Sequence, residues 1–281
     1  MKTRILFLAA LLFSAHVFAQ SAVWQVRKGD RSLYLGGSVH TLRASDFPLP
    51  VEFDRAFENS SILVLETDLE ELSRPDSLQK LLPYITLPAG KTLQTELSPR
   101  AFQSFEEKCR ELGVPVASLS SMTPFMAIVA LTGVQFQQMG FLSGVDQHYQ
   151  ERARKEGKKQ IFLESVIDQI RLLDGENEEF LQQSLKELGP EMKKIVTTLV
   201  AEWRRGELAE NEKLIREMKA SAPRFHRRIF AERNRAWLKK IKEYLDTPET
   251  EFFLVGFGHL VSDDGLLKGL RDQGYEVIQL R

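Results

Sequence analysis

The sequence predicts an α/β (α+β) fold, in which a mixed central β-sheet is built from both ends of the chain and surrounded by helices. Short apolar segments with strand character lie at residues 23–65 and again at 252–280. Between them, from about residue 167 to 246, the chain is charged and helical in pattern. We therefore expect one sheet that is completed by the C-terminal strands, with a charged helical insertion in the sequence before them.

In the first half of the chain, strands and helices are predicted to alternate. The expected elements are a hairpin over 23–26 and 32–35, a helix over 51–59, a strand over 62–65, a helix over 99–112, a buried apolar helix over 124–138 and a strand over 160–163. Ser98 is the expected cap of the helix over 99–112, and Ser143 is expected to cap a further helix that buries Val145, Tyr149 and Ala153.

In the second half, helices precede the returning strands. The expected elements are an amphipathic helix with the apolar stripe Met192, Ile195, Val196, Leu199, Val200 and Trp203, a long helix over 225–245, a strand over 252–255, a helix over 265–272 and a strand over 275–280. The stripe repeats at the spacing of one helix face, which predicts that this face packs on other elements.

The N-terminus has the pattern of a secretory signal peptide. Lys2 and Arg4 form a basic region, residues 5–12 an apolar region, and residues 17–19 a small-residue cleavage site. A membrane anchor is the alternative, but the apolar run is short for a span. We expect cleavage after Ala19, a periplasmic or secreted protein, and a single domain over residues 20–281 without a stable membrane span.

Charge and cysteine content narrow the possible partners. With 38 basic and 39 acidic residues the net charge is −1, and no basic stripe is interleaved with aromatic residues, so nucleic acid is not an expected partner. Cys109 is the only cysteine, which excludes an internal disulfide.

Two predicted strands end in the same Gly-x-x-His pattern. An apolar strand runs into Gly37-Ser38-Val39-His40, and a second runs into Gly256-Phe257-Gly258-His259. Glycine lets the backbone turn sharply at a strand exit, and open α/β sheets bind their ligands at the carboxyl ends of strands. One such pattern often arises by chance in a surface loop, but two in matching contexts indicate a shared site.

Two other strands run into a glutamate followed by a predicted helix start. Glu66 and Glu164 are expected at the last strand positions, with Thr67 and Ser165 as helix caps. An unpaired carboxylate at a buried strand end is unfavourable, so these glutamates need partners. Two histidines with carboxylates suit a divalent metal ion such as Zn²⁺, Mn²⁺ or Co²⁺, or general acid–base catalysis without a metal.

Arg233 lies on the apolar face of the long helix, between Ile229 and Trp237. A guanidinium there needs a carboxylate or a substrate oxyanion as its partner. Asn234 either bonds the same site or lies at the flank of the helix. His148 and His226 lie in charged helices and are expected to be solvated.

Taken together, these residues resemble the TraB/GumN family, which is related to the Tiki proteins. The matching stretches are Leu35-Gly36-Gly37-Ser38-Val39-His40, Pro48-Leu49-Pro50, Val64-Leu65-Glu66-Thr67, Gly144-Val145-Asp146, Leu163-Glu164-Ser165, Arg233-Asn234 and Val255-Gly256-Phe257-Gly258-His259. They extend from about residue 23 to the C-terminus. Many members have Gly-Thr where this chain has Gly37-Ser38, a conservative difference because either side chain supplies a hydroxyl.

The resemblance implies a core similar to the erythromycin-esterase and ChaN-like proteins and a metal-dependent peptidase activity. His40, Glu66 and His259 would then be the metal or catalytic residues, with Glu164 a close candidate. In this hypothesis the metal lowers the pKa of a bound water, Glu164 or Glu66 takes its proton, and Arg233 stabilises the oxyanion.

Two other functions remain open from the sequence. One is a metal-free, esterase-like hydrolase in which a histidine is the base that activates water. The other is a non-catalytic protein that binds a ligand or peptide in the same cleft, as the resemblance to the haem-binding ChaN-like proteins permits. The expected partner is accordingly a peptide or a small-molecule substrate.

Overall fold

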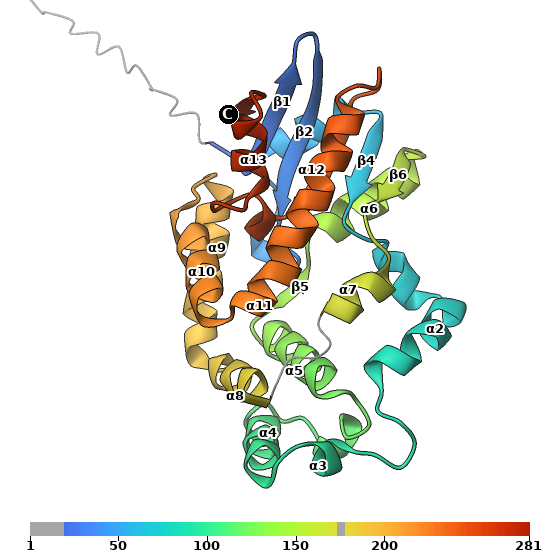
Figure 1. Ribbon diagram of the computed structural model, residues 1–281, viewed down its shortest axis with the longest axis vertical. Helices are drawn as coiled ribbons and strands as arrows, with labels where there is room; N and C mark the ends of the chain where they lie inside the picture. Colours follow the sequence, from blue (N-terminus) through green and yellow to red (C-terminus); the bar gives the residue numbers. More distant parts are fainter. Residues whose placement is uncertain (1–19, 173–177) are drawn as a thin grey trace, which may run out of the picture.

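The computed structural model describes residues 20–172 and 178–281, so the expected signal peptide lies outside the described residues (Figure 1). A six-stranded sheet with the order β6-β4-β7-β2-β1-β8 forms the centre of the fold. Its strands are β1 (Val23–Lys28), β2 (Arg31–Ser38), β4 (Ile62–Leu65), β6 (Lys159–Phe162), β7 (Glu251–Gly256) and β8 (Glu276–Gln279). A second sheet pairs β3 (Leu42–Arg43) with β5 (Phe141–Ser143).

The four strands β6, β4, β7 and β2 are mutually parallel, whereas β1 is antiparallel to both β2 and β8. The carboxyl ends of the four parallel strands therefore meet at one edge of the sheet. Ser38 pairs with Gly256, and Leu65 pairs with both Leu254 and Phe162. This register aligns the residues that follow each strand, which is where open α/β sheets place their ligands.

Helices make up the rest of the molecule. They are α1 (Val51–Glu58), α2 (Pro75–Ile85), α3 (Leu93–Glu96), α4 (Pro99–Glu111), α5 (Pro124–Gln138), α6 (Val145–Glu156), α7 (Val166–Leu172), α8 (Glu178–Glu187), α9 (Pro190–Arg204), α10 (Ala209–Ser221), α11 (Pro223–His226), α12 (Arg233–Tyr244) and α13 (Leu266–Asp272). Short 3₁₀ turns are η1 (Ala44–Asp46), η2 (Leu69–Ser73), η3 (Val116–Ser118) and η5 (Phe257–His259), and η4 (Arg227–Glu232) is a π-helical turn that joins α11 to α12.

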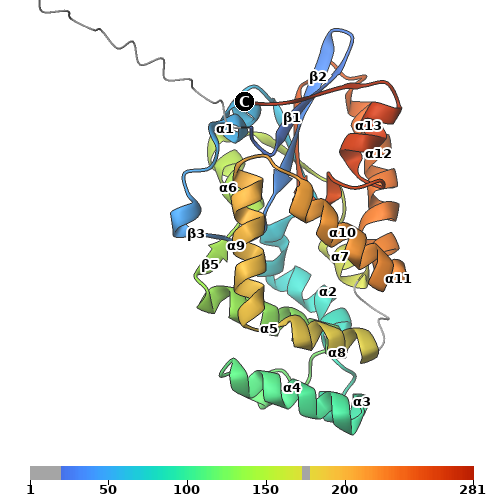
Figure 2. The same ribbon diagram turned by 90° about the vertical axis from the view of Figure 1, so that its left-hand side faces the viewer.

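Helices cover both faces of the sheet. Figure 2 shows α1 and α6 on one side of it and α12 with α13 on the other. The central strand β7 is buried along its whole length, and Phe252, Phe253 and Leu254 have no exposed surface. Removing this much apolar surface from water is the main stabilisation of such a core.

A second hydrophobic core lies among the helices in the lower part of Figure 1. It is formed by α3, α4, α5 and α8, with Leu93, Phe105, Cys109, Leu131 and Leu185 buried in it. The stretch expected as a helical insertion is divided between the two cores. Helix α8 contributes to the second, while α9, α10 and α12 contribute Trp203, Ile215 and Trp237 to the first.

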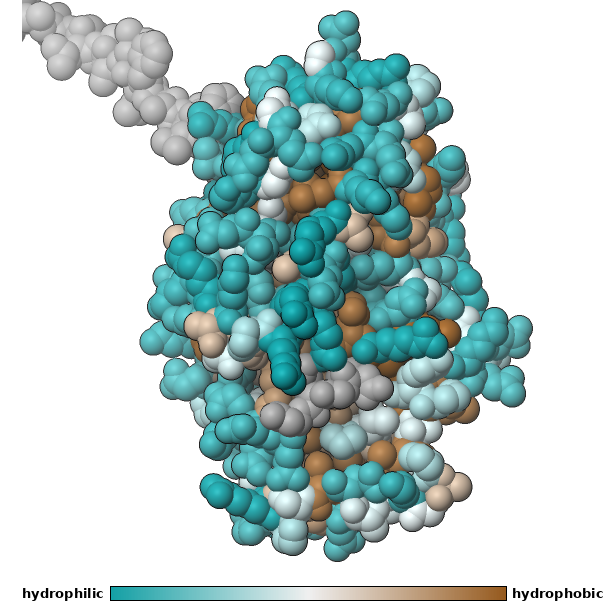
Figure 3. Space-filling model, viewed as in Figure 1, coloured by the Kyte–Doolittle hydropathy of each residue, from teal (hydrophilic) through white to brown (hydrophobic). Residues whose placement is uncertain are grey.

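Hydrophilic residues cover most of the face shown in Figure 3, in keeping with a chain in which 27% of the residues are charged. Among the described residues, no helix is both long enough and apolar enough to cross a bilayer.

The predicted α/β class is confirmed, and so is the order of its elements, with some local errors. Gly144 rather than Ser143 precedes the first turn of α6, because Ser143 ends the strand β5. Asp68 rather than Thr67 caps the turn after β4, accepting the backbone N–H of Glu70. Helix α5 buries only part of its surface, and Val129 on it is 40% exposed.

Candidate active site

Each of the four parallel strands delivers one chemically active side chain just beyond its carboxyl end. His40 follows β2, Glu66 follows β4, Glu164 follows β6 and His259 follows β7. Glu66 lies one residue and Glu164 two residues past its strand, so neither occupies the last strand position as expected. The four residues, 40, 66, 164 and 259, nevertheless lie at one edge of the sheet.

Three of these side chains converge on the backbone of Gly256. A β-carbon added there would lie 3.1 Å from Glu66 Oε1, 3.3 Å from His40 Nε2 and 3.5 Å from His259 Cδ2. A β-carbon there would press on Glu66 and His40 and would touch His259. Glycine at 256 is therefore what permits the side chains to approach one another.

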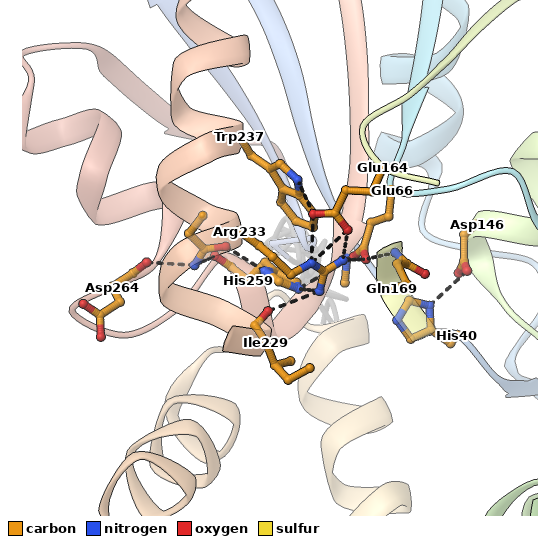
Figure 4. Close-up of polar contacts among 12 residues, drawn as sticks. His40, Glu66, Asp146, Glu164, Gln169, Ile229, Arg233, Trp237, His259 and Asp264 are labelled. Carbon is orange, nitrogen blue, oxygen red and sulfur yellow. Dashed lines mark hydrogen bonds and ion pairs between the residues drawn. The ribbon is translucent and has the colours of Figure 1, made fainter. Parts of the chain in front are cut away.

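Arg233 lies at the centre of the buried part of the cluster (Figure 4). Its Nε donates to both carboxylate oxygens of Glu164 at 3.0 Å, and its Nη2 lies 2.6 Å from Glu66 Oε2 and 2.9 Å from Glu164 Oε2. Its Nη1 donates to the carbonyl of Ile229 at 3.2 Å and to His259 Nε2 at 2.9 Å. These contacts engage all three nitrogens of the guanidinium, through hydrogen bonds to four different residues and a further ion pair with Glu164.

The contacts of His259 fix its tautomer. Because a guanidinium can only donate, Nε2 of His259 accepts from Arg233, and the ring proton must lie on Nδ1. That proton is donated to Asn234 Oδ1 at 2.6 Å, while Asn234 Nδ2 donates to the carbonyl of Asp264. Burial lowers the pKa of His259 to about 3, and the positive charge of Arg233 adds to the effect. His259 is thus a neutral imidazole whose nitrogens are both engaged.

Glu66 is held as a carboxylate. Its Oε1 accepts the backbone N–H of Gly256 at 2.6 Å, and its Oε2 accepts from Arg233 and from Gln169 at 3.2 Å. Burial alone would raise the pKa of Glu66, but the positive charge of Arg233 and the hydrogen bond from the backbone of Gly256 oppose it, and the pKa is lowered to about 2. A carboxylate this acidic is a weak base.

Glu164 lies behind Arg233. Its Oε1 accepts from Trp237 Nε1 at 3.0 Å in addition to Arg233, and the Trp237 ring lies 4.5 Å from the guanidinium carbon. The partner that the sequence requires for Arg233 is therefore a pair of carboxylates, Glu66 and Glu164.

His40 differs from the other members because one of its nitrogens is free. Its Nδ1 lies 3.0 Å from Asp146 Oδ2, and its Nε2 has no hydrogen-bond partner among residues 20–172 and 178–281. The side chain is 65% exposed, against 12% for Asp146. The negative charge of Asp146 raises the pKa of His40 to about 9.

The start of α6 places Asp146 beside His40. A β-carbon at Gly144 would lie only 2.3 Å from the carbonyl oxygen of His40, so only glycine lets the helix begin this close. Val145 N donates to the carbonyl of Val39 at 3.0 Å and fixes the same approach. Asp146 occupies the first turn of the helix, where a negative charge is favourable.

A cleft of about 800 Å³ opens in front of the cluster. Among the residues that line it are His40, Glu66, Asp146 and Gln169, while α6 contributes Gln147, Gln150, Glu151 and Arg154. Arg233, Glu164 and His259 are not among the lining residues. The cleft therefore exposes His40 and one edge of Glu66, and the buried trio lies behind them.

The expected metal ligands do not present their donor atoms to one point. His40 Nε2 and Glu66 Oε1 both face Gly256, but His259 turns a carbon atom there and gives its Nε2 to Arg233. In the described part of the chain, no group of three or more His, Cys, Asp or Glu side chains has the arrangement of a metal site. As arranged here, the three residues do not fit a divalent ion.

Two contributors to the site and one structural histidine differ from the sequence-based expectations. The sequence predicts no site role for Asp146 or Gln169, because neither residue follows a strand end in the sequence. His226 was expected to be solvated but is only 2% exposed, and its burial lowers its pKa.

The chain is thus an α/β protein in which four parallel strands end in two Gly-x-x-His turns and two glutamates. The sequence model of the TraB/PrgY/gumN family matches residues 22–279. The chain belongs to that family.

Among curated proteins, the chain is similar to YbaP of Escherichia coli (strain K12) and of Shigella flexneri, both described as uncharacterized. The identity is 26% over 147 residues in each case, covering 52% of this chain and 53% of the relative. The match thus spans about half the length of these relatives.

Proposed function

We propose that the chain is a hydrolase in which His40 is the general base that activates water for attack on an acyl substrate in the cleft. The observation that carries the proposal is the pair formed by His40 and Asp146. One ring nitrogen is bound to a mostly buried carboxylate, the other is free, and the residue lines the cleft. A base oriented by a carboxylate is the arrangement used to remove a proton from a nucleophile.

In the proposed reaction, His40 carries one proton from water to the leaving group. His40 Nε2 takes a proton from water, and the hydroxide forms a bond to the substrate carbonyl carbon. The imidazolium that results is stabilised by Asp146, 3.0 Å away. It then returns the proton to the leaving group as the acyl bond breaks, so His40 ends the cycle neutral.

Neither glutamate is as well suited to this role. Glu66 has a pKa of about 2, and both of its oxygens accept hydrogen bonds. Glu164 accepts from Arg233 and Trp237 and is not among the residues that line the cleft. We assign both to holding Arg233 and His259 in place.

The family resemblance suggests a metal-dependent peptidase instead, with His40, Glu66 and His259 as ligands. That function requires His259 Nε2 to exchange its bond with Arg233 for one with the metal. Peptides and small esters are both candidate substrates. The basic and apolar N-terminus of the sequence supports export to the periplasm or beyond.

A hydrolysis screen tests the proposal. Small activated esters such as p-nitrophenyl acetate, and a set of peptides, are offered to the protein in chelator and then with Zn²⁺, Mn²⁺ or Co²⁺. We expect turnover in chelator that His40→Ala reduces by about 10²–10⁴-fold. His148→Ala removes a histidine outside the cluster and is the matched control.

Two other results point elsewhere. Turnover that appears only with added metal, and is lost in both His40→Ala and His259→Ala, supports the metal-dependent peptidase. Ligand binding without turnover of any substrate supports a binding protein.

A further inference from the structure

We infer that Arg233 is a positioning residue: its guanidinium holds Glu66 and His259 in one arrangement beside His40 and makes no contact with substrate. The first support is the number of protein contacts that Arg233 makes. Glu164, Glu66, His259 and the carbonyl of Ile229 together engage all three nitrogens of the guanidinium. A substrate oxyanion would have to displace one of them.

The second support is the location of Arg233. Its side chain is 9% exposed and is not among the cleft-lining residues. Glu66 lies between it and the cleft, and the ring of Trp237 covers it at 4.5 Å. Arginine is suited to this position because its planar guanidinium binds several acceptors at fixed angles, which a lysine ammonium cannot do.

The π-helical turn η4 supplies a further contact that holds Arg233. In an α-helix the backbone N–H of Arg233 would bond the carbonyl of Ile229, but here it bonds that of Phe230. The carbonyl of Ile229 instead accepts the guanidinium at 3.2 Å. The same turn carries Phe230, whose ring lies 4.9 Å from that of His259. One irregular turn thus positions both Arg233 and the imidazole that it binds, and such turns are frequent at functional sites.

The consequence is a fixed tautomer. With Arg233 donating to Nε2 and Asn234 accepting from Nδ1, His259 has only one way to satisfy both nitrogens. His259 and Glu66 are then held in fixed positions beside His40. A displacement of these side chains by an ångström is enough to reduce a rate on the order of 10²-fold.

NMR of the two ring nitrogens of His259 tests the inference. The full chain is labelled with ¹⁵N-histidine, and the His259 signals are assigned with His259→Gln. We expect wild-type His259 to have a protonated Nδ1 and an unprotonated Nε2. In Arg233→Met the contact with Asn234 still favours this tautomer, but the Nε2 resonance should shift because Nε2 has lost its donor. In the same variant, kcat for the ester should fall on the order of 10²-fold while KM changes less than about threefold. Arg233→Lys should not restore the wild-type Nε2 resonance.

Arg235→Met is the matched control, because Arg235 is an exposed arginine on the same helix. An Nε2 resonance of His259 that is unchanged in Arg233→Met, or a KM that rises more than about tenfold, would overturn the inference; the rise in KM would assign the guanidinium to substrate. If Arg233→Met fails to fold, the wild type still decides: binding of a phosphonate analogue should leave the Arg233 Nε–H signal unshifted, and a large shift contradicts the inference. The kinetic measurement depends on the proposed hydrolase function, whereas the ¹⁵N resonances of His259 can be measured whether or not the protein is a hydrolase.

Discussion

At the scale of single residues, the site divides into a reactive edge and a rigid interior. His40 is the member with a free nitrogen and an exposed ring within the described part of the chain. Arg233, Glu164 and His259 have their polar atoms bonded to one another or to the protein. Buried ion pairs of this kind are sensitive to the loss of one partner, because the other charge is left uncompensated.

Glu164→Gln separates two roles for this glutamate. As a charge partner of Arg233, its substitution should lower the free energy of unfolding by roughly 3 kcal/mol. Because the amide oxygen of the substituted side chain would still accept from Arg233, kcat/KM should fall less than about tenfold. Urea unfolding and ester hydrolysis measure the two effects.

The opposite pattern would make Glu164 a catalytic base. That role requires unchanged stability together with a loss of activity on the order of 10²–10⁴-fold. Asp168→Asn on α7, at an exposed position, serves as the control for removing one negative charge nearby.

At the scale of elements, the close approach of α6 to the end of β2 creates the pair of His40 and Asp146. Gly144→Ala places a methyl group 2.3 Å from the carbonyl oxygen of His40. We expect a loss of about 1–3 kcal/mol in the free energy of unfolding, together with loss of the His40–Asp146 contact and of activity.

Gly133→Ala is the control for that substitution. Gly133 lies within α5, and an added methyl group there meets nothing within 4 Å. Because alanine favours a helix interior, this variant should gain about 0.5–1 kcal/mol. Thermal unfolding of both variants measures the difference, and equal stabilities would contradict the proposed contact.

The first residue of β7, Glu251, is expected to make the stability of the protein depend on pH. Glu251 is 1% exposed, and its Oε2 has no hydrogen-bond partner among the described residues, so burial raises its pKa to about 7. A carboxyl whose pKa is higher folded than unfolded gives stability that is present below the unfolded value of about 4.5 and is lost as the pH rises through 7.

Glu251→Gln should therefore stabilise the protein at pH 8 by roughly 2–3 kcal/mol and have little effect at about pH 4. Chemical unfolding at the two pH values measures the difference. A variant that is equally stabilised at both values would show that Glu251 does not titrate in the folded protein.

At the scale of the whole molecule, the sequence predicted the sheet and the strand ends because both depend on local patterns. Apolar runs identified β4 and β7, and the glycines after β2 and β7 marked where the chain leaves the sheet. Parallel pairing of those strands then brings their ends together. The convergence of His40, Glu66, Glu164 and His259 follows from this topology.

The second core and the inner contacts of the site depend on packing between distant segments. Nothing local in α8 indicates that it packs with α3, α4 and α5 rather than on the sheet. Asp146 reaches His40 across 106 residues of sequence, and Gln169 reaches Glu66 across 103. The contacts of Arg233 with Glu66, Glu164 and His259 likewise join distant segments and are visible only in three dimensions.

The pH dependence of kcat/KM in chelator tests most directly whether His40 is the base. Because a base must be unprotonated and Asp146 raises the pKa of His40 to about 9, the rate should rise with pH to a plateau above that value. Asp146→Asn keeps an acceptor for Nδ1 but removes the charge. Its midpoint should therefore move down toward 6.5, the ordinary histidine value. A profile with the same midpoint in both proteins would contradict the account.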